Sequence, residues 1–130
     1  MSMTTSIPTF RGRVQAIDGG QVTISIPDSP YRLVLAVLHP PAAGVGDAVH
    51  GTVVAEAARV HVASAGGRFL EPTQGPLRTV AGRVECIDDA GCIVRSVIPL
   101  RVNLDAVDPD LREGDLVTFD VRPSAVWSEA

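Results

Sequence analysis

Apolar and polar residues alternate along much of the chain, with the period of two that is typical of β-strands. The clearest case is Val22-Thr23-Ile24-Ser25-Ile26, in which apolar and polar residues alternate strictly. Asp18-Gly19-Gly20 separates this run from Val14 to Ile17, and such a turn sequence predicts a β-hairpin. Further strands are predicted over residues 31–38, from residue 47 onward and over 59–63. The pattern therefore indicates an all-β chain.

The same pattern occurs a second time in the C-terminal half. A repeat defines the structural unit and gives many residues an internal counterpart. Three segments recur in order, with the spacing between copies falling from 70 to 69 to 68 residues: Gly12 to Asp18 as Gly82 to Asp88, Pro30 to Arg32 as Pro99 to Arg101, and Gly46 to Val49 as Gly114 to Val117. Matched strands joined by connections of slightly different length account for this drift.

The second copy is predicted to contain strands over 79–87, 92–97, 100–104, 116–122 and 125–127. Between its third and fourth strands we expect a single helical turn. Asp108 can cap this turn, Pro109 suits the first helical position and Gly114 can end it.

The segment between the copies is rich in glycine and proline. Gly66-Gly67 is expected to turn residues 60–63 back onto 68–70 as a hairpin, and Pro72 to Pro76 to lead into the second copy. We therefore place one repeat at residues 8–72 and the other at residues 78–128.

Five short strands in each copy are expected to close into a barrel, because closure removes the open strand edges that promote aggregation. The predicted fold is two tandem five-stranded barrels like the oligonucleotide/oligosaccharide-binding (OB) fold. Since each barrel alone would bury little surface, we expect the two to pack together. One continuous sheet or sandwich built from both copies is the alternative.

The closing strands of the second copy resemble a known family. Gly114-Asp115-Leu116-Val117-Thr118-Phe119-Asp120-Val121-Arg122-Pro123-Ser124-Ala125-Val126 is similar to the end of TOBE and Mop domains, and Gly82-Arg83-Val84 to their opening strand. These OB-like modules end bacterial transporter ATPases and molybdate-handling proteins, and tandem copies can bind molybdate or tungstate. The Ser-Ala-Arg-Asn opening of molybdate-binding Mop modules is replaced here by Thr9-Phe10-Arg11-Gly12 and Thr79-Val80-Ala81-Gly82. The resemblance therefore implies the fold and not the ligand.

The charge balance disfavours nucleic acid as a partner. The chain has 11 basic residues, all arginine, against 15 acidic ones, for a net charge of −4. It therefore has no overall positive field to attract phosphate backbones. No apolar run reaches the length of a membrane span, and Met1 to Ser6 lacks the features of a secretion signal. We expect no membrane association and a cytoplasmic location.

Four arginines are the candidate ligand-binding residues. Arg13 matches Arg83, Arg32 matches Arg101, and strand alternation predicts that all four side chains project outward. Guanidinium groups can fork onto an oxyanion, so these residues are candidates for one shared oxyanion site or two equivalent ones. The simpler interpretation is that each arginine pairs with an acidic neighbour on the surface, for example Glu85.

Histidines and cysteines do not predict a metal site. His50 and His61 are expected side by side on consecutive strands, but zinc needs a third protein ligand, for which Glu56 or His39 would have to be recruited. We therefore interpret both histidines as surface residues.

Cys86 and Cys92 flank a predicted turn, which leaves a disulfide across the hairpin open. Their counterparts in the first copy are Ala16 and Val22, and apolar counterparts favour inert, buried free thiols over a disulfide or over redox or metal chemistry.

The sequence contains no nucleophile paired with a base and no phosphate-binding glycine loop. Phe119 alternates with core residues and is expected to be buried. Tyr31, Phe69 and Trp127 are the candidate contact aromatics, either as stacking platforms for bases or as a surface between copies or subunits.

These features predict a non-enzymatic binding or assembly module whose partner is an unidentified protein or another copy of the chain, as in a homo-oligomer. The first alternative is a protein that binds small oxyanions such as molybdate or tungstate at Arg13, Arg32, Arg83 and Arg101. The second is an OB protein that binds single-stranded nucleic acid. No cofactor is predicted.

Overall fold

The computed structural model describes residues 7–130, with the backbone alone described at Pro123 and Ser124. The described residues form strands and no helix, so the all-β prediction is confirmed. None of them belongs to a helix long and apolar enough to cross a membrane. Residues 1–6, where the sequence predicts no secretion signal, lie outside the described residues.

Seven of the strands precede the second predicted repeat, and five lie within it. The first seven are β1 (Phe10–Asp18), β2 (Gln21–Ser25), β3 (Arg32–Val37), β4 (Ala48–Ala57), β5 (His61–Val62), β6 (Phe69–Glu71) and β7 (Gln74–Pro76). The last five are β8 (Thr79–Ile87), β9 (Gly91–Arg95), β10 (Pro99–Leu104), β11 (Leu116–Asp120) and β12 (Arg122–Glu129).

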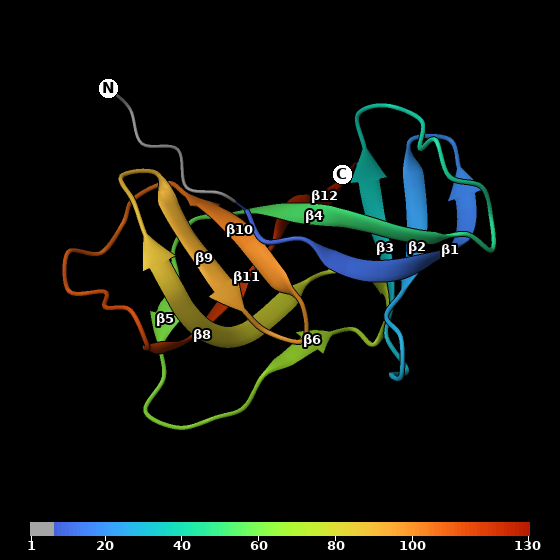
Figure 1. Cartoon of the computed structure of the whole chain (residues 1–130). Helices are drawn as coiled ribbons and strands as arrows, with labels where there is room; N and C mark the ends of the chain where they lie inside the picture. Colours follow the sequence, from blue (N-terminus) through green and yellow to red (C-terminus); the bar gives the residue numbers. More distant parts are fainter. Residues whose placement is uncertain (1–6) are drawn as a thin grey trace.

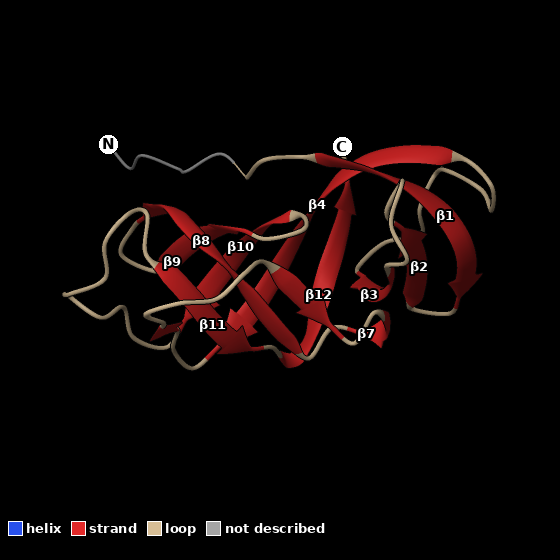
Figure 2. Cartoon of the chain, turned by 90° about the horizontal axis from the view of Figure 1, so that it is seen from below, coloured by secondary structure: helices blue, strands red, loops and turns tan. Residues whose placement is uncertain are grey.

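Five strands close into a barrel. They pair in the order β1, β2, β3, β12 and β4, and β4 pairs back with β1. The contact of β3 with β12 is parallel, and the other four are antiparallel. Figure 2 shows β12, which comes from the C-terminal end of the chain, between β4 and β3. The closed barrel therefore joins strands from both predicted repeats.

The remaining strands also combine the two repeats. β8, β9 and β10 pair in sequence order, and β11 pairs with β8. β10 then runs parallel to the end of β4, from Val54 to Ala57, and β11 pairs with β5. In Figure 1, β4 runs between the two groups of strands. The two halves thus exchange strands within one sheet of 12 strands.

The predicted hairpin around Gly66-Gly67 is wrong. β5 pairs with β11, whereas β6 pairs with β8. β7 then pairs in parallel with β3, so the segment between the repeats contacts both halves. β5 and β7 satisfy their backbone groups on strands distant in sequence, and β6 does so on β8 after a connection of seven residues.

The predicted helical turn at Asp108 is also absent. The Asp108 carboxylate accepts a hydrogen bond from the N–H of Asp110 at 2.9 Å, and its carbonyl accepts one from the N–H of Leu111 at 3.0 Å. The first of these bonds is the cap predicted for Asp108, but the N–H of Arg112 donates to Asp115 Oδ2 at 2.9 Å, so the turn does not continue as a helix. The turn buries Leu111, which is 4% exposed.

The repeated Gly-Arg-Val and Gly-Asp segments make the same contacts in both halves. Arg13 Nη1 donates to the carbonyl of Gly46 at 2.5 Å, and Arg83 Nη1 donates to that of Gly114 at 2.6 Å. The two glycines have φ angles of 93° and 91°, a conformation that favours glycine. Their N–H groups donate to the valine after each arginine, at 2.8 Å in both halves. The motif therefore fastens β1 and β8 to the turns before β4 and β11.

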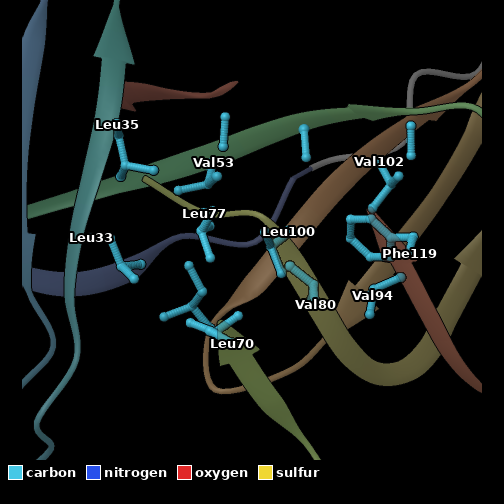
Figure 3. Close-up of a cluster of buried hydrophobic side chains, with 14 of the residues drawn as sticks. Leu33, Leu35, Val53, Leu70, Leu77, Val80, Val94, Leu100, Val102 and Phe119 are labelled. Carbon is cyan, nitrogen blue, oxygen red and sulfur yellow. The ribbon is translucent and has the colours of Figure 1, made fainter. Parts of the chain in front are cut away.

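One hydrophobic core runs through both halves. Figure 3 shows Leu33 of β3 on one side of this core, Leu100 and Phe119 on the other, and Val53 of β4 between them. All four side chains are at most 1% exposed, and the prediction that Phe119 is buried is confirmed. Because the core is continuous, removing apolar groups from one half should also affect the packing of the other.

Trp127 of β12 closes the core of the barrel. Its side chain is 3% exposed, and its ring meets Phe10 edge to face, with 5.5 Å between ring centroids and 72° between ring planes. A Cβ atom at Gly51 would lie 2.4 Å from both Trp127 Cη2 and the carbonyl oxygen of Ser128. Gly51 therefore lets β12 and its tryptophan lie directly against β4.

We expect Gly51→Ala to lower the free energy of unfolding by about 1–3 kcal/mol, because overpacking forces β12 away from β4. Gly67→Ala is the matched control, since nothing lies within 4 Å of a Cβ built there. The control should stay within about 0.5 kcal/mol of the wild type. Urea denaturation of the three proteins measures both effects. Equal stability of the two variants would contradict the close packing of Trp127 on Gly51.

Candidate anion-binding site

Three arginine side chains line one small surface pocket in the C-terminal half. Arg68 precedes β6, Arg83 lies on β8 and Arg95 ends β9, and together with Val84 and Glu85 they enclose about 170 Å³. β6 and β9 both pair with β8, and these pairings bring the arginines together. The pocket therefore depends on three strands, with β6 and β9 each paired to β8.

The electrostatics of this pocket are unbalanced. Arg83 and Arg95 are direct partners across β8 and β9, and like charges in that position repel. Arg95 Nη2 lies 3.1 Å from Glu85 Oε1 and 3.4 Å from Oε2. Three guanidinium groups against one carboxylate leave the lining with a formal charge of 3 − 1 = +2. The chain as a whole has a net charge of −4, so the pocket opposes the overall charge.

Glu85 reaches Arg95 from a β-bulge. The pairing of β8 with β9 shifts between Val84 and Cys86, which leaves Glu85 without a direct partner on β9. Bulges change the direction of a side chain and are typical of sites that need a group placed off the regular ladder. The first half has the same shift between Val14 and Ala16. The bulge therefore belongs to the repeated fold, and the charge on it does not.

The equivalent place in the first half carries fewer charges. Arg13 corresponds to Arg83, and its partner on β2 is Ser25 in place of Arg95. Gln15 Nε2 donates to Ser25 Oγ at 3.0 Å, so a neutral hydrogen bond replaces the ion pair. The same local fold thus forms without Arg95 and Glu85. The charges in the second half are not required by the backbone that holds them.

The four arginines predicted from the sequence do not form one site. Of the four, only Arg83 lines the arginine pocket. Arg13 lies on the barrel strand β1 and is bound to the carbonyl of Gly46. Arg32 is exposed at the start of β3. Arg83 makes the equivalent contact with Gly114, and what distinguishes it from Arg13 is the neighbouring Arg68 and Arg95 of the pocket.

The match of Arg32 with Arg101 is also wrong. Leu33 and Leu100 are the structural equivalents. Each of them pairs with a residue of the second strand of its half, and that residue pairs with the matched valine of the first strand, Val14 or Val84. Arg32 therefore corresponds to Pro99 and not to Arg101. The connection from β2 to β3 has six residues and that from β9 to β10 has three. An alignment guided by the shared proline shifts the register of this strand.

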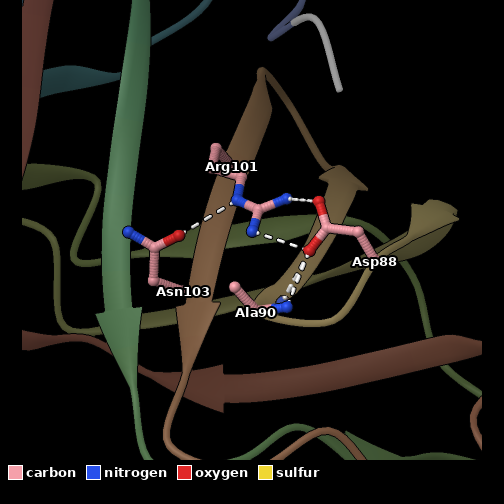
Figure 4. A network of polar contacts seen from close by, with 5 residues as sticks. Asp88, Ala90, Arg101 and Asn103 are labelled. Carbon is pink, nitrogen blue, oxygen red and sulfur yellow. Dashed lines mark hydrogen bonds and ion pairs between the residues drawn. The ribbon is translucent and has the colours of Figure 1, made fainter. Parts of the chain in front are cut away.

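Arg101 is a structural residue, and the prediction that it projects outward is wrong. Its side chain is 11% exposed and donates from Nη1 and Nη2 to the two carboxylate oxygens of Asp88, as Figure 4 shows. Nε donates to Asn103 Oδ1 at 3.0 Å. The hydrogen bond with Asp88 raises the pKa of Arg101. A guanidinium group whose Nε, Nη1 and Nη2 all donate to side chains of the protein has no free edge for a ligand.

The candidate contact aromatics are less accessible than the sequence suggests. Trp127 is buried in the barrel core, so the expectation that it is an exposed contact residue is wrong. Tyr31 is half-buried and packs against the core, and Phe69 is half-buried on β6. None of the five aromatic side chains in the chain is fully exposed, since Phe10 is half-buried and Phe119 is buried.

The two histidines do not lie side by side. His50 pairs with Arg11 of β1, whose Nε lies 3.1 Å from His50 Nε2, whereas His61 pairs with Thr118 of β11. Across residues 7–130, no group of three or more histidine, cysteine or acidic residues is arranged to hold a metal ion.

One larger hollow of the surface carries mixed charges. The hollow of about 810 Å³ beside β8 and β11 is lined by Glu71, Arg78 and Asp120 among others, and Asp120 accepts a hydrogen bond from Thr79 at 3.2 Å. Its charged groups therefore do not favour one sign of ligand. Large apolar side chains are exposed at Ile17, Leu38, Val45 and Val62. A protein partner or self-association stays a prediction.

Only part of the arginine pocket could be predicted from the sequence. The predicted strands put Arg83 and Arg95 on neighbouring strands, but a regular hairpin would pair Arg83 with Ser96, and the bulge at Glu85 shifts the register so that Arg83 faces Arg95. Arg68 joins them only because β6 pairs with β8, a contact that the predicted hairpin at Gly66-Gly67 does not include. Comparisons with known protein families, curated proteins and solved structures gave no match for this chain.

The two cysteines are free thiols. Cys92 is fully buried, as its counterpart Val22 is, whereas Cys86 is half-buried. Burial raises the pKa of the Cys92 thiol from 9.0 to about 11, although Arg101 acts in the opposite direction. Burial and the nearby Glu85 also raise the pKa of Cys86. High thiol pKa values make both cysteines poor nucleophiles at neutral pH.

The raised pKa of Cys92 predicts a loss of stability at high pH. The unfolded chain ionises this thiol above pH 9, whereas the folded protein keeps it protonated up to about pH 11. The stabilisation is therefore complete below pH 9 and falls by about 2 kcal/mol between pH 9 and 11. Cys92→Val, which copies Val22, should remove this part of the fall, and Cys86→Ala, which copies Ala16, should not. Urea unfolding across this range tests the prediction, and parallel curves for wild type and Cys92→Val would refute it.

Proposed function

We propose that this chain is a non-enzymatic binding module that holds an anionic group in the pocket of Arg68, Arg83 and Arg95. The observation that carries the proposal is that three arginine side chains and a single glutamate line this pocket. An anion in this place relieves the repulsion between Arg83 and Arg95 and accepts charge-assisted hydrogen bonds. Binding therefore has a source of free energy that the equivalent place in the first half, with Ser25 opposite Arg13, lacks.

The ligand is a small oxyanion. The pocket encloses about 170 Å³, less than the roughly 300–1,000 Å³ of pockets that hold drug-sized molecules. Phosphate, sulfate, molybdate and tungstate belong to this class, and arginine forks match their oxygen geometry. Compared with the set expected from the sequence, Arg68 and Arg95 take the place of Arg13, Arg32 and Arg101.

The other two functional classes have less support. The lining offers positive charge but no nucleophile, and its carboxylate, Glu85, is engaged by Arg95. Enzymatic chemistry therefore has no starting group in this pocket. Binding of single-stranded nucleic acid depends on exposed aromatic platforms, and the aromatic side chains of this chain are buried or half-buried. Anion binding agrees best with the residues present.

The scaffold of this module is two OB-like barrels that exchange their fifth strands. The second half would close through the end of β4 and β5, as the first closes through β12. In support, β10 runs parallel to β4 as β3 runs parallel to β12. β11 also pairs antiparallel with β5, as β4 does with β12. This reciprocal arrangement keeps the proposed resemblance to TOBE and Mop domains and explains why the repeats need each other.

We expect Arg95→Ser, which copies Ser25 of the first half, to weaken anion binding by about tenfold, the value of one charge-assisted hydrogen bond. Arg32→Ser is the matched control, since Arg32 is exposed on β3 and outside the pocket. Calorimetric titration at low ionic strength with sulfate, phosphate and molybdate gives the three affinities. Absence of binding heat in the wild type at millimolar concentrations of every anion would refute the proposal.

Exchange of strands also predicts that two fragments of the chain complement each other. Residues 1–72 lack β12, and residues 73–130 lack β4 and β5, so neither should fold cooperatively alone. Mixing them should restore the β-sheet circular dichroism spectrum and a cooperative thermal transition. A second fragment that ends at residue 120 lacks β12 and is the control that should fail. Cooperative unfolding of fragment 1–72 by itself would show that the exchange is dispensable.

A further inference from the structure

The carboxylate of Glu85 lies in the lining of the arginine pocket, against one of its three arginines. It contacts Arg95 through Nη2, at 3.1 and 3.4 Å from its two oxygens. Both side chains are more than two-fifths exposed, at 44% for Arg95 and 43% for Glu85. A pair with this exposure is weak and exchanges readily with water and ions. The pocket therefore already holds a carboxylate, and that carboxylate can leave.

We propose that Glu85 is an internal competitor for the anion site, a carboxylate that holds Arg95 until a ligand anion displaces it. This inference rests on the proposed function. Glu85 is a chemical stand-in for the ligand because a carboxylate and an oxyanion accept the same guanidinium hydrogen bonds. The bulge at Glu85 provides its position, and the first half, with Gln15 at the same bulge, has no such competitor.

Competition by a tethered group lowers the affinity of every ligand that has to displace it by the same factor. A group tethered by a short flexible link competes at an effective concentration in the millimolar range. A simple monocarboxylate forms the same ion pair with Arg95 that Glu85 forms, so replacing Glu85 by it releases little free energy. A dianionic tetrahedral oxyanion brings a second charge and further oxygens for Arg68 and Arg83. Glu85 thus sets a threshold that dianionic oxyanions, such as sulfate and phosphate, exceed more easily than monocarboxylates such as acetate.

Displacement has to be distinguished from a general effect of negative charge near the pocket. Glu85→Gln removes both the competing carboxylate and its charge. Glu85→Asp keeps the charge but shortens the side chain by one methylene, so the carboxylate no longer reaches Arg95. Asp89→Asn removes one negative charge from the exposed β8–β9 turn, outside the residues that line the pocket, and controls for net charge. The three variants separate occupation of the pocket from its surrounding field.

The experiment is calorimetric titration of the full chain and its variants with sulfate, inorganic phosphate and acetate. We expect Glu85→Gln to bind sulfate and phosphate about two- to fivefold more tightly than the wild type, the range set by an exposed ion pair. The same factor should apply to both anions, because each has to displace the same carboxylate. Glu85→Asp should show part of this gain, Asp89→Asn should match the wild type, and acetate should bind more weakly than sulfate throughout.

The outcomes separate this inference from the proposed function. If neither the wild type nor Glu85→Gln binds any anion, both the anion site and the competitor are refuted. If the wild type binds sulfate and Glu85→Gln binds it equally, the site stands and the competitor role is overturned. An affinity of Glu85→Asp equal to that of the wild type, together with a gain in Glu85→Gln, would also overturn displacement and leave only a field effect.

Discussion

Strand β4 is the constraint on which the rest of this structure depends, because it serves both halves of the chain. Its beginning pairs with β1, its middle and end pair with β12, and its last residues also pair with β10. A strand shared in this way ties the register of one half to that of the other. The continuous core follows from it, since side chains of β4 such as Val53 lie between the two groups of strands.

A comparison of the two repeats distinguishes the contacts that the fold requires from the side chains that only one copy carries. The contacts of Arg13 with Gly46 and of Arg83 with Gly114 are the same in both halves, so they belong to the fold. Arg95 and Glu85 are present in one half only, at positions where serine and glutamine suffice in the other. The backbone of this bulge forms without Arg95 and Glu85, so these charges favour a role in binding over a role in folding.

Local patterns predicted the strands well and their partners poorly. β2, β8 and β10 lie where alternation and turn residues place them, because these signals act between residues close in sequence. The pairing partners of β5, β6 and β7 were predicted wrongly or not at all, because a short strand can pair with any open strand edge. For the site, the predicted hairpin put Arg83 and Arg95 on neighbouring strands, whereas the bulge that aligns them and the pairing of β6 with β8 beside Arg68 were not predicted. The burial of Arg101 and Trp127 likewise depended on neighbours that are distant in sequence.

The sequence by itself determined the all-β class, the repeated unit and the turns that bound it, because period-two alternation, glycine and aspartate act through local backbone geometry. The tertiary structure alone decided that β12 completes the barrel of the other half and that three arginines share a pocket. Both outcomes depend on which strand edges meet in space. Strand edges pair through backbone groups that nearly every residue carries, so the residue types along the chain do not predict which edges pair.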